Sequence, residues 1–88
     1  MNKFYVAFVN KKEPASKHDC MPNREVAIVC GKRMLLDNAQ ITVAVETFMM
    51  NDFGHKFLVL AEEKHVLPDG SIPYDPSFPH IVIYEDAT

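Results

Sequence analysis

The sequence predicts an α+β domain, with a four-stranded, mostly antiparallel sheet, one helix at about residues 38–52 and the element order ββαββ. Three observations support this fold class. The 88 residues are enough for one domain, residues 1–88, with a single small core. Apolar residues make up 48% and charged residues 24% of the chain, as in an ordinary folded domain. Several runs rich in β-branched and aromatic residues are separated by proline, glycine and polar segments.

The first two strands are expected at the two apolar runs of the amino-terminal half. KFYVAFVN, residues 3–10, alternates aromatic and aliphatic side chains and ends where two lysines begin. Residues 11–23 contain two prolines and many polar side chains, which indicates a loop. REVAIVCG, residues 24–31, is the second predicted strand, ended by Gly31, with Cys30 buried inside it as a reduced thiol.

Residues 35–54 carry conflicting signals, and the helix is predicted from the signals at its ends. Asp37 can cap a helix, with Gln40 three residues later as in a capping box. Gly54 stands where a left-handed residue would end that helix. The β-branched residues between these ends favour a strand instead. An all-β meander, turning at both ends of the segment, or a small barrel is therefore the alternative.

The last two strands are expected at HKFLVLAEE, residues 55–63, and HIVIYED, residues 80–86. In all four predicted strands both alternating sets of side chains are apolar, which is typical of a sheet covered on both faces. One helix cannot easily cover two faces. The second face is therefore expected to be covered by residues 66–80, by a second copy of the chain or by a partner. A small barrel that closes on itself is the alternative.

The segment VLPDGSIPYDPSFPH, residues 66–80, is the candidate binding element. Its four prolines restrict the backbone before binding, so less entropy is lost on docking. The sequence Pro68-Asp69-Gly70 predicts a turn. In the alternative, the larger side chains of the segment fold inward and cover the second sheet face. The expected binding residues are Ile72, Tyr74, Asp75 and Phe78 of this segment, with Tyr5 and Tyr84 of the sheet.

Other kinds of site have less support in the sequence. His18, Asp19 and Cys20 are adjacent, but a structural zinc site needs paired ligands, and the chain offers no second pair at suitable spacing. Catalysis by Cys20 would need an orienting group and an oxyanion hole on a rigid scaffold. The glycines are not clustered into a phosphate loop. We therefore expect no metal, no cofactor and no enzymatic activity.

Charge and hydropathy limit which kinds of partner and which cellular location the sequence favours. The net charge is −3. Residues 1–36 carry seven basic and three acidic side chains, whereas residues 37–88 carry two basic and nine acidic ones. The pI near 5.7 disfavours nucleic acid as a partner. We expect a cytoplasmic protein without a membrane segment, because the sequence contains neither a bilayer-length apolar run nor a secretory signal.

The run ITVAVETFMMNDFGHKFLVLAEEKHV, residues 41–66, and the opening KFYVAFVN resemble small phage-encoded β-β-α-β proteins. In those proteins a helix ends in an Asn-x-x-Gly or Asn-Pro-Gly turn and leads into a strand of the type Phe-x-Val-Leu. The present chain has β-branched residues where that group has alanine. Members of the group mostly have no assigned activity, so the resemblance implies a phage or mobile-element accessory protein and no particular functional residues.

Taken together, these patterns predict a non-catalytic protein-binding module. A phage-type inhibitor or modifier of a host protein, acting in the host cytoplasm, fits this prediction, and a homodimer would cover the second sheet face. The alternative is a small-ligand-binding or sequestering protein, with its pocket under residues 66–80 or at a dimer interface.

Overall fold

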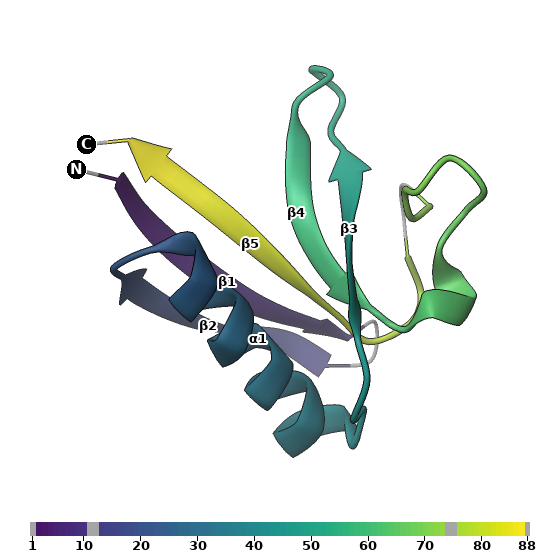
Figure 1. Cartoon of the computed structure of the whole chain (residues 1–88), viewed down its shortest axis with the longest axis horizontal. Helices are drawn as coiled ribbons and strands as arrows, with labels where there is room; N and C mark the ends of the chain where they lie inside the picture. The colour runs from purple at the N-terminus through teal and green to yellow at the C-terminus, as the bar shows by residue number, and fades with distance from the viewer. Residues whose placement is uncertain (1, 11–12, 74–75, 88) are drawn as a thin grey trace.

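A computed structural model describes residues 2–10, 13–73 and 76–87, and of residues 2, 13–21 and 86–87 the backbone alone. This part of the chain forms a five-stranded antiparallel sheet with one α-helix against one face (Figure 1). The α+β class and the antiparallel sheet with one helix are confirmed. The elements are β1 (Asn2–Asn10), β2 (Glu13–Met21), α1 (Arg24–Ala39), β3 (Val45–Met50), β4 (Lys56–Ala61), the 3-10 helix η1 (Glu63–His65) and β5 (His80–Ala87).

The strands are arranged in the order β2-β1-β5-β4-β3. β1 and β5 pair along almost their whole length, from Asn2 opposite Ala87 to Val9 opposite His80. β5 and β4 pair only over Leu58–Leu60, opposite Ile81–Ile83, and beyond these residues the two strands diverge (Figure 1). The sheet therefore consists of a broad β2-β1-β5 part and a β3–β4 hairpin that are joined along a short seam.

Residues 24–31, which were predicted to be a strand, form the first half of α1. Asn23 caps this helix, because its side-chain oxygen accepts a hydrogen bond of 2.9 Å from the Val26 N–H. Apolar residues lie on both faces of the helix, so the segment has the continuous apolar pattern of a buried strand. Cys30 is consequently a half-buried free thiol of a helix, and burial raises its pKa. Within the described residues, no helix has the length and apolar character that a membrane crossing requires.

The helix predicted over residues 38–52 is wrong. Asp37 lies in the last turn of α1, 3.3 Å from the guanidinium of Arg33, instead of capping a new helix. Gln40 adopts the left-handed conformation, with φ of 56°, and its N–H donates to the Leu36 carbonyl at 3.0 Å. This is a helix C-terminal motif with glutamine in the usual place of glycine. The β-branched residues that follow lead into β3, as their propensity favours.

The loop predicted over residues 11–23 is also wrong, because Glu13–Met21 forms the edge strand β2. In its pairing with β1, Val6 lies opposite His18 and Phe8 lies opposite Ser16. The register shifts twice along this pair, and Pro14 is near its beginning. Such irregularities suit an edge strand, since they hinder the addition of a further strand. Pairing with β1 thus outweighs the poor strand propensity of the segment.

The central strands β1, β4 and β5 have buried residues on both faces, as the apolar patterns of the predicted strands indicate. On one face α1 packs against alternate residues of β1, β4 and β5. On the other face, residues of the 62–79 connection pack against the intervening residues of these strands. The helix-side core contains Val6, Phe8, Leu60, Ile81 and Ile83 with Ala27, Met34 and Leu35 of α1. The opposite core contains Val59, Ala61 and Val82 with Ile72 of the connection.

Gly31 sets the distance between α1 and the sheet. A Cβ atom at this position would lie 2.7 Å from the Leu60 side chain and 2.9 Å from Cγ2 of Ile81. Only glycine allows this close approach, so Gly31 is a packing residue of the helix and does not end a strand.

Candidate functional site

Val66, Ile72 and Phe78 of the segment 66–80 pack on the face of the sheet opposite α1. Ile72 is 4% exposed and packs with Val59 and Val82. Phe78 is half-buried against the same cluster, and the His65 ring stacks on it at 3.8 Å with an interplanar angle of 7°. Of the predicted binding residues in this segment, Ile72 and Phe78 therefore point inward, which is the arrangement in which the segment covers the sheet.

The predicted turn at Pro68-Asp69-Gly70 is confirmed. The Gly70 N–H donates to the Leu67 carbonyl at 2.9 Å, and Gly70 has φ of 89°. The Asp69 carboxylate accepts hydrogen bonds from the hydroxyl and the N–H of Ser71 at 2.6 and 3.0 Å, and these bonds hold its pKa below the ordinary value. Asp69 is therefore a turn residue.

Two hydrogen bonds fasten this turn to the outer edge of β3. The Thr47 hydroxyl donates to the Gly70 carbonyl. The Ile72 N–H donates to the Phe48 carbonyl at 3.0 Å. The connection thus continues the hydrogen bonding of the sheet beyond β3 for a short distance, which protects part of that edge.

The remaining predicted binding residues do not join Ile72 and Phe78 in one described surface. Tyr74 and Asp75 lie outside the described residues. Tyr5 of β1 and Tyr84 of β5 are directly opposite each other in the sheet. Tyr84 is four residues after His80, where the 62–79 connection enters β5. Tyr84 is 39% exposed, and its ring makes an edge-on contact with Phe57 at 5.4 Å.

His80 is a buried titratable group at the junction of the connection and β5. It is 2% exposed, and its Nδ1 lies 2.9 Å from the Phe78 carbonyl oxygen. Burial lowers the pKa of the His80 imidazole below its ordinary value of 6.5, although the hydrogen bond to Phe78 opposes this shift. The folded state therefore favours neutral His80.

We expect the domain to lose stability as the pH falls below 6.5, the ordinary His pKa, and through the lower folded-state pKa of His80. In this range His80 binds a proton in the unfolded state but stays neutral in the folded state, so the free energy of unfolding decreases with decreasing pH. Urea denaturation of the wild type and of His80→Gln across this range measures the effect. The variant should show a shallower pH dependence than the wild type. Equal slopes for wild type and His80→Gln would contradict the assignment.

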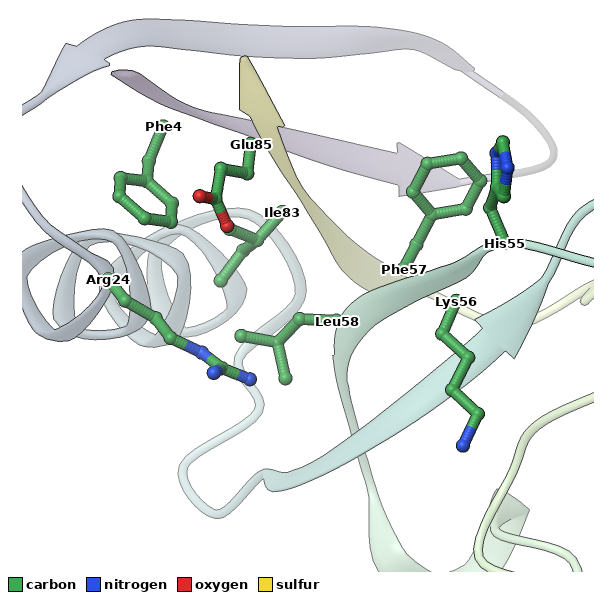
Figure 2. A pocket seen from close by; sticks show the side chains of 8 residues that line it. All are labelled: Phe4, Arg24, His55, Lys56, Phe57, Leu58, Ile83 and Glu85. Atoms are coloured by element: carbon green, nitrogen blue, oxygen red, sulfur yellow. The ribbon is translucent and has the colours of Figure 1, made fainter. Parts of the chain in front are cut away.

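A cleft of about 340 Å³ opens where β4 diverges from β5. Figure 2 shows Arg24 reaching from the first turn of α1 toward β4, with Phe4 and Phe57 at opposite ends of the cleft. Its walls also carry Lys56 and Glu85, so both charges are present. This mixture defines no single ligand chemistry, and the small-ligand alternative stays a prediction.

A wider groove, of about 560 Å³, runs along the outer face of α1. Val26, Val29 and Leu36 line it and are 40%, 68% and 43% exposed. Their helical spacing puts them on the face turned away from the sheet. Cys30 and Ile41 add further apolar surface to the groove. Cys30 and Ile41 also pack against the edge of the helix-side core, whereas Val26, Val29 and Leu36 do not belong to it.

The rim of this groove is basic. Among its described lining residues Lys32 and Arg33 are charged, and none is acidic. Arg33 shares its charge with Asp37 in an ion pair of 3.3 Å. Lys32 makes no ion pair with any residue that the structure describes. The groove therefore suits an apolar side chain that has a carboxylate beside it.

The sequence predictions missed this groove because they placed Val26 and Val29 in a buried strand. One local signal was available: Asn23 with Glu25 in the following turn is a common helix beginning. With a helix beginning there, the exposed aliphatic face follows from residue spacing alone.

The described residues also contain no group of three or more His, Cys, Asp or Glu side chains that could hold a metal ion. The side chains of His18, Asp19 and Cys20 lie outside the described ones. The comparisons with known proteins find no family model, no curated protein and no solved structure that matches the chain. The fold and the groove thus define a small α+β domain with an exposed, basic-rimmed apolar surface, and the resemblance to phage proteins stays a prediction.

Proposed function

We propose that the protein is a non-catalytic protein-binding module that uses the outer groove of α1. The observation that supports this function is the row of exposed aliphatic side chains Val26, Val29 and Leu36 on a helix whose other face is already packed. Contiguous exposed apolar surface with a polar rim is typical of interaction sites. An inhibitor or modifier of a host protein is the form of this function that the sequence resemblance favours.

The groove is best suited to an acidic, amphipathic segment of another protein. An apolar side chain of that segment would pack between Val29 and Leu36, and a carboxylate next to it would pair with Lys32. Two copies joined groove to groove are disfavoured. In that symmetric contact Lys32 and Arg33 of one copy would face the same residues of the other copy.

Site-specific photo-crosslinking in cells tests this function. A benzoylphenylalanine at position 29, which is 68% exposed, is expected to give one dominant adduct. The peptide attached to it should contain acidic and apolar residues. The matched position is Leu67, which is 43% exposed but outside the groove, and it should give no such adduct.

Charge reversal adds a second criterion. Lys32→Glu should reduce the adduct from position 29 by about tenfold, because like charges would then meet at the rim. If positions 29 and 67 gave the same adducts, or if Lys32→Glu left the adduct unchanged, the groove would not be the binding site.

A further inference from the structure

The turn between β3 and β4 presents a single phenylalanine at the end of a hairpin. Phe53 is 84% exposed. The Asn51 side-chain oxygen accepts hydrogen bonds of 2.9 Å from the N–H groups of Phe53 and His55. The Gly54 N–H donates to the Asn51 carbonyl at 3.1 Å, and Gly54 has the left-handed φ of 79° that this turn requires. The turn is therefore fixed before any contact, which limits the entropy lost when Phe53 docks.

The charge of this turn complements the groove on α1. Exposed Asp52 stands next to Phe53. The nearest basic side chain along β4, Lys56, has its ammonium 4.7 Å from the centroid of the Phe48 ring, away from the turn. The turn thus presents an aromatic ring with an adjacent carboxylate, which is the chemistry that the groove and Lys32 accommodate.

We propose that Phe53 of one copy docks in the outer groove of α1 of a second copy, with Asp52 beside Lys32. Figure 1 shows the β3–β4 turn at the top of the view and α1 at the lower left. Phe53 is highly exposed, so it does not occupy the groove of its own chain. The contact joins two different surfaces, so copies associate head to tail and can add further copies. This inference rests on the proposed function, since it names a second copy as an occupant of the same groove.

The contact is weak on its own. One aromatic anchor in a groove buries much less surface than a stable dimer needs, and we expect a dissociation constant on the order of 100 µM. A protein partner of the proposed kind competes for the groove. Head-to-tail association therefore occurs at high protein concentration and is reversed by the partner.

Complementation between two variants tests the contact. Phe53→Ala removes the anchor and keeps the groove, whereas Val29→Asp disables the groove and keeps the anchor. Both positions are exposed, and thermal melting establishes that each variant is folded. Met50→Ala, at a 43% exposed position of the same hairpin, is the control and should associate like the wild type.

In sedimentation velocity up to about 1 mM, the mean mass of the wild type should rise with concentration, and each variant alone should stay monomeric. An equimolar mixture of the two variants should form a one-to-one dimer that grows no further, because only one intact anchor and one intact groove remain. A monomeric wild type, a monomeric mixture, or association that persists in either variant would overturn the inference. Crosslinking from position 29 in a Phe53→Ala background separates the two proposals, because an adduct with a partner persists there and an adduct with a second copy is lost. The proposed function therefore survives the failure of this inference and fails only if no partner adduct forms.

Discussion

Replacing Ile72 with alanine is expected to lower the free energy of unfolding by about 2–4 kcal/mol. Ile72 is 4% exposed and covers Val59, Ala61 and Val82 on the face of the sheet opposite α1. The truncated side chain would leave a cavity between the 62–79 connection and the sheet. In a domain of this size such a loss lowers Tm by roughly 10–30 °C, which thermal unfolding followed by circular dichroism measures.

Leu67→Ala is the matched control for this substitution. Leu67 belongs to the same connection but is 43% exposed, so its truncation should change the stability by no more than about 0.5 kcal/mol. If Ile72→Ala were as mild as Leu67→Ala, the connection would not cover the sheet, and its apolar residues would again be candidates for an interface.

Gly31→Val is expected to destabilise the domain by about 3 kcal/mol or more. The first added carbon would already lie 2.7 Å from the Leu60 side chain and 2.9 Å from Cγ2 of Ile81. Leu60 can shift the end of its flexible side chain, but the branched Cβ of Ile81 is stiff. Valine would therefore push α1 away from the sheet, and urea unfolding measures the loss.

Lys32→Val introduces the same side chain at the next position of the helix. Lys32 is exposed on the outer side of α1, so this variant should differ from the wild type by only a few tenths of a kcal/mol in helix propensity. Equal stabilities of the two variants would show that the close approach at Gly31 is not required for packing.

Local patterns were sufficient to predict the parts of the fold whose signals are local. The strands at residues 3–10, 55–63 and 80–86 have continuous apolar runs, and the turn at Pro68-Asp69-Gly70 has characteristic turn residues. The apolar residues on both faces of these strands also predicted that the second face must be covered. Which segment covers it depends on a long-range contact, so the sequence could not choose between the connection, a second copy and a partner.

The sequence predictions placed a strand where α1 begins and a helix where β3 lies, and the reason is the way α1 packs on the sheet. Within residues 24–31 the buried positions of α1 are the small residues Ala27 and Gly31, while the larger Val26 and Val29 face outward. Its large buried side chains, Met34 and Leu35, come only after this segment. The usual contrast between a large apolar face and a polar face is therefore absent from this helix, and its β-branched residues indicate a strand. The groove was missed for the same reason, since exposed valines in a helix look like buried valines in a strand.

The short seam between β4 and β5 has a consequence for motion. α1 packs mainly on β1 and β5. The β3–β4 hairpin is held to them by the residue pairs Leu58–Leu60 opposite Ile81–Ile83, by the packing of Leu60 on α1, and by the 62–79 connection. That connection is bonded to β3 at Ile72 and leads directly into β5 at His80. Local opening of the connection would leave the hairpin held by this seam and by the packing of Leu60 on α1, so the hairpin would then have fewer attachments than the β2-β1-β5 part.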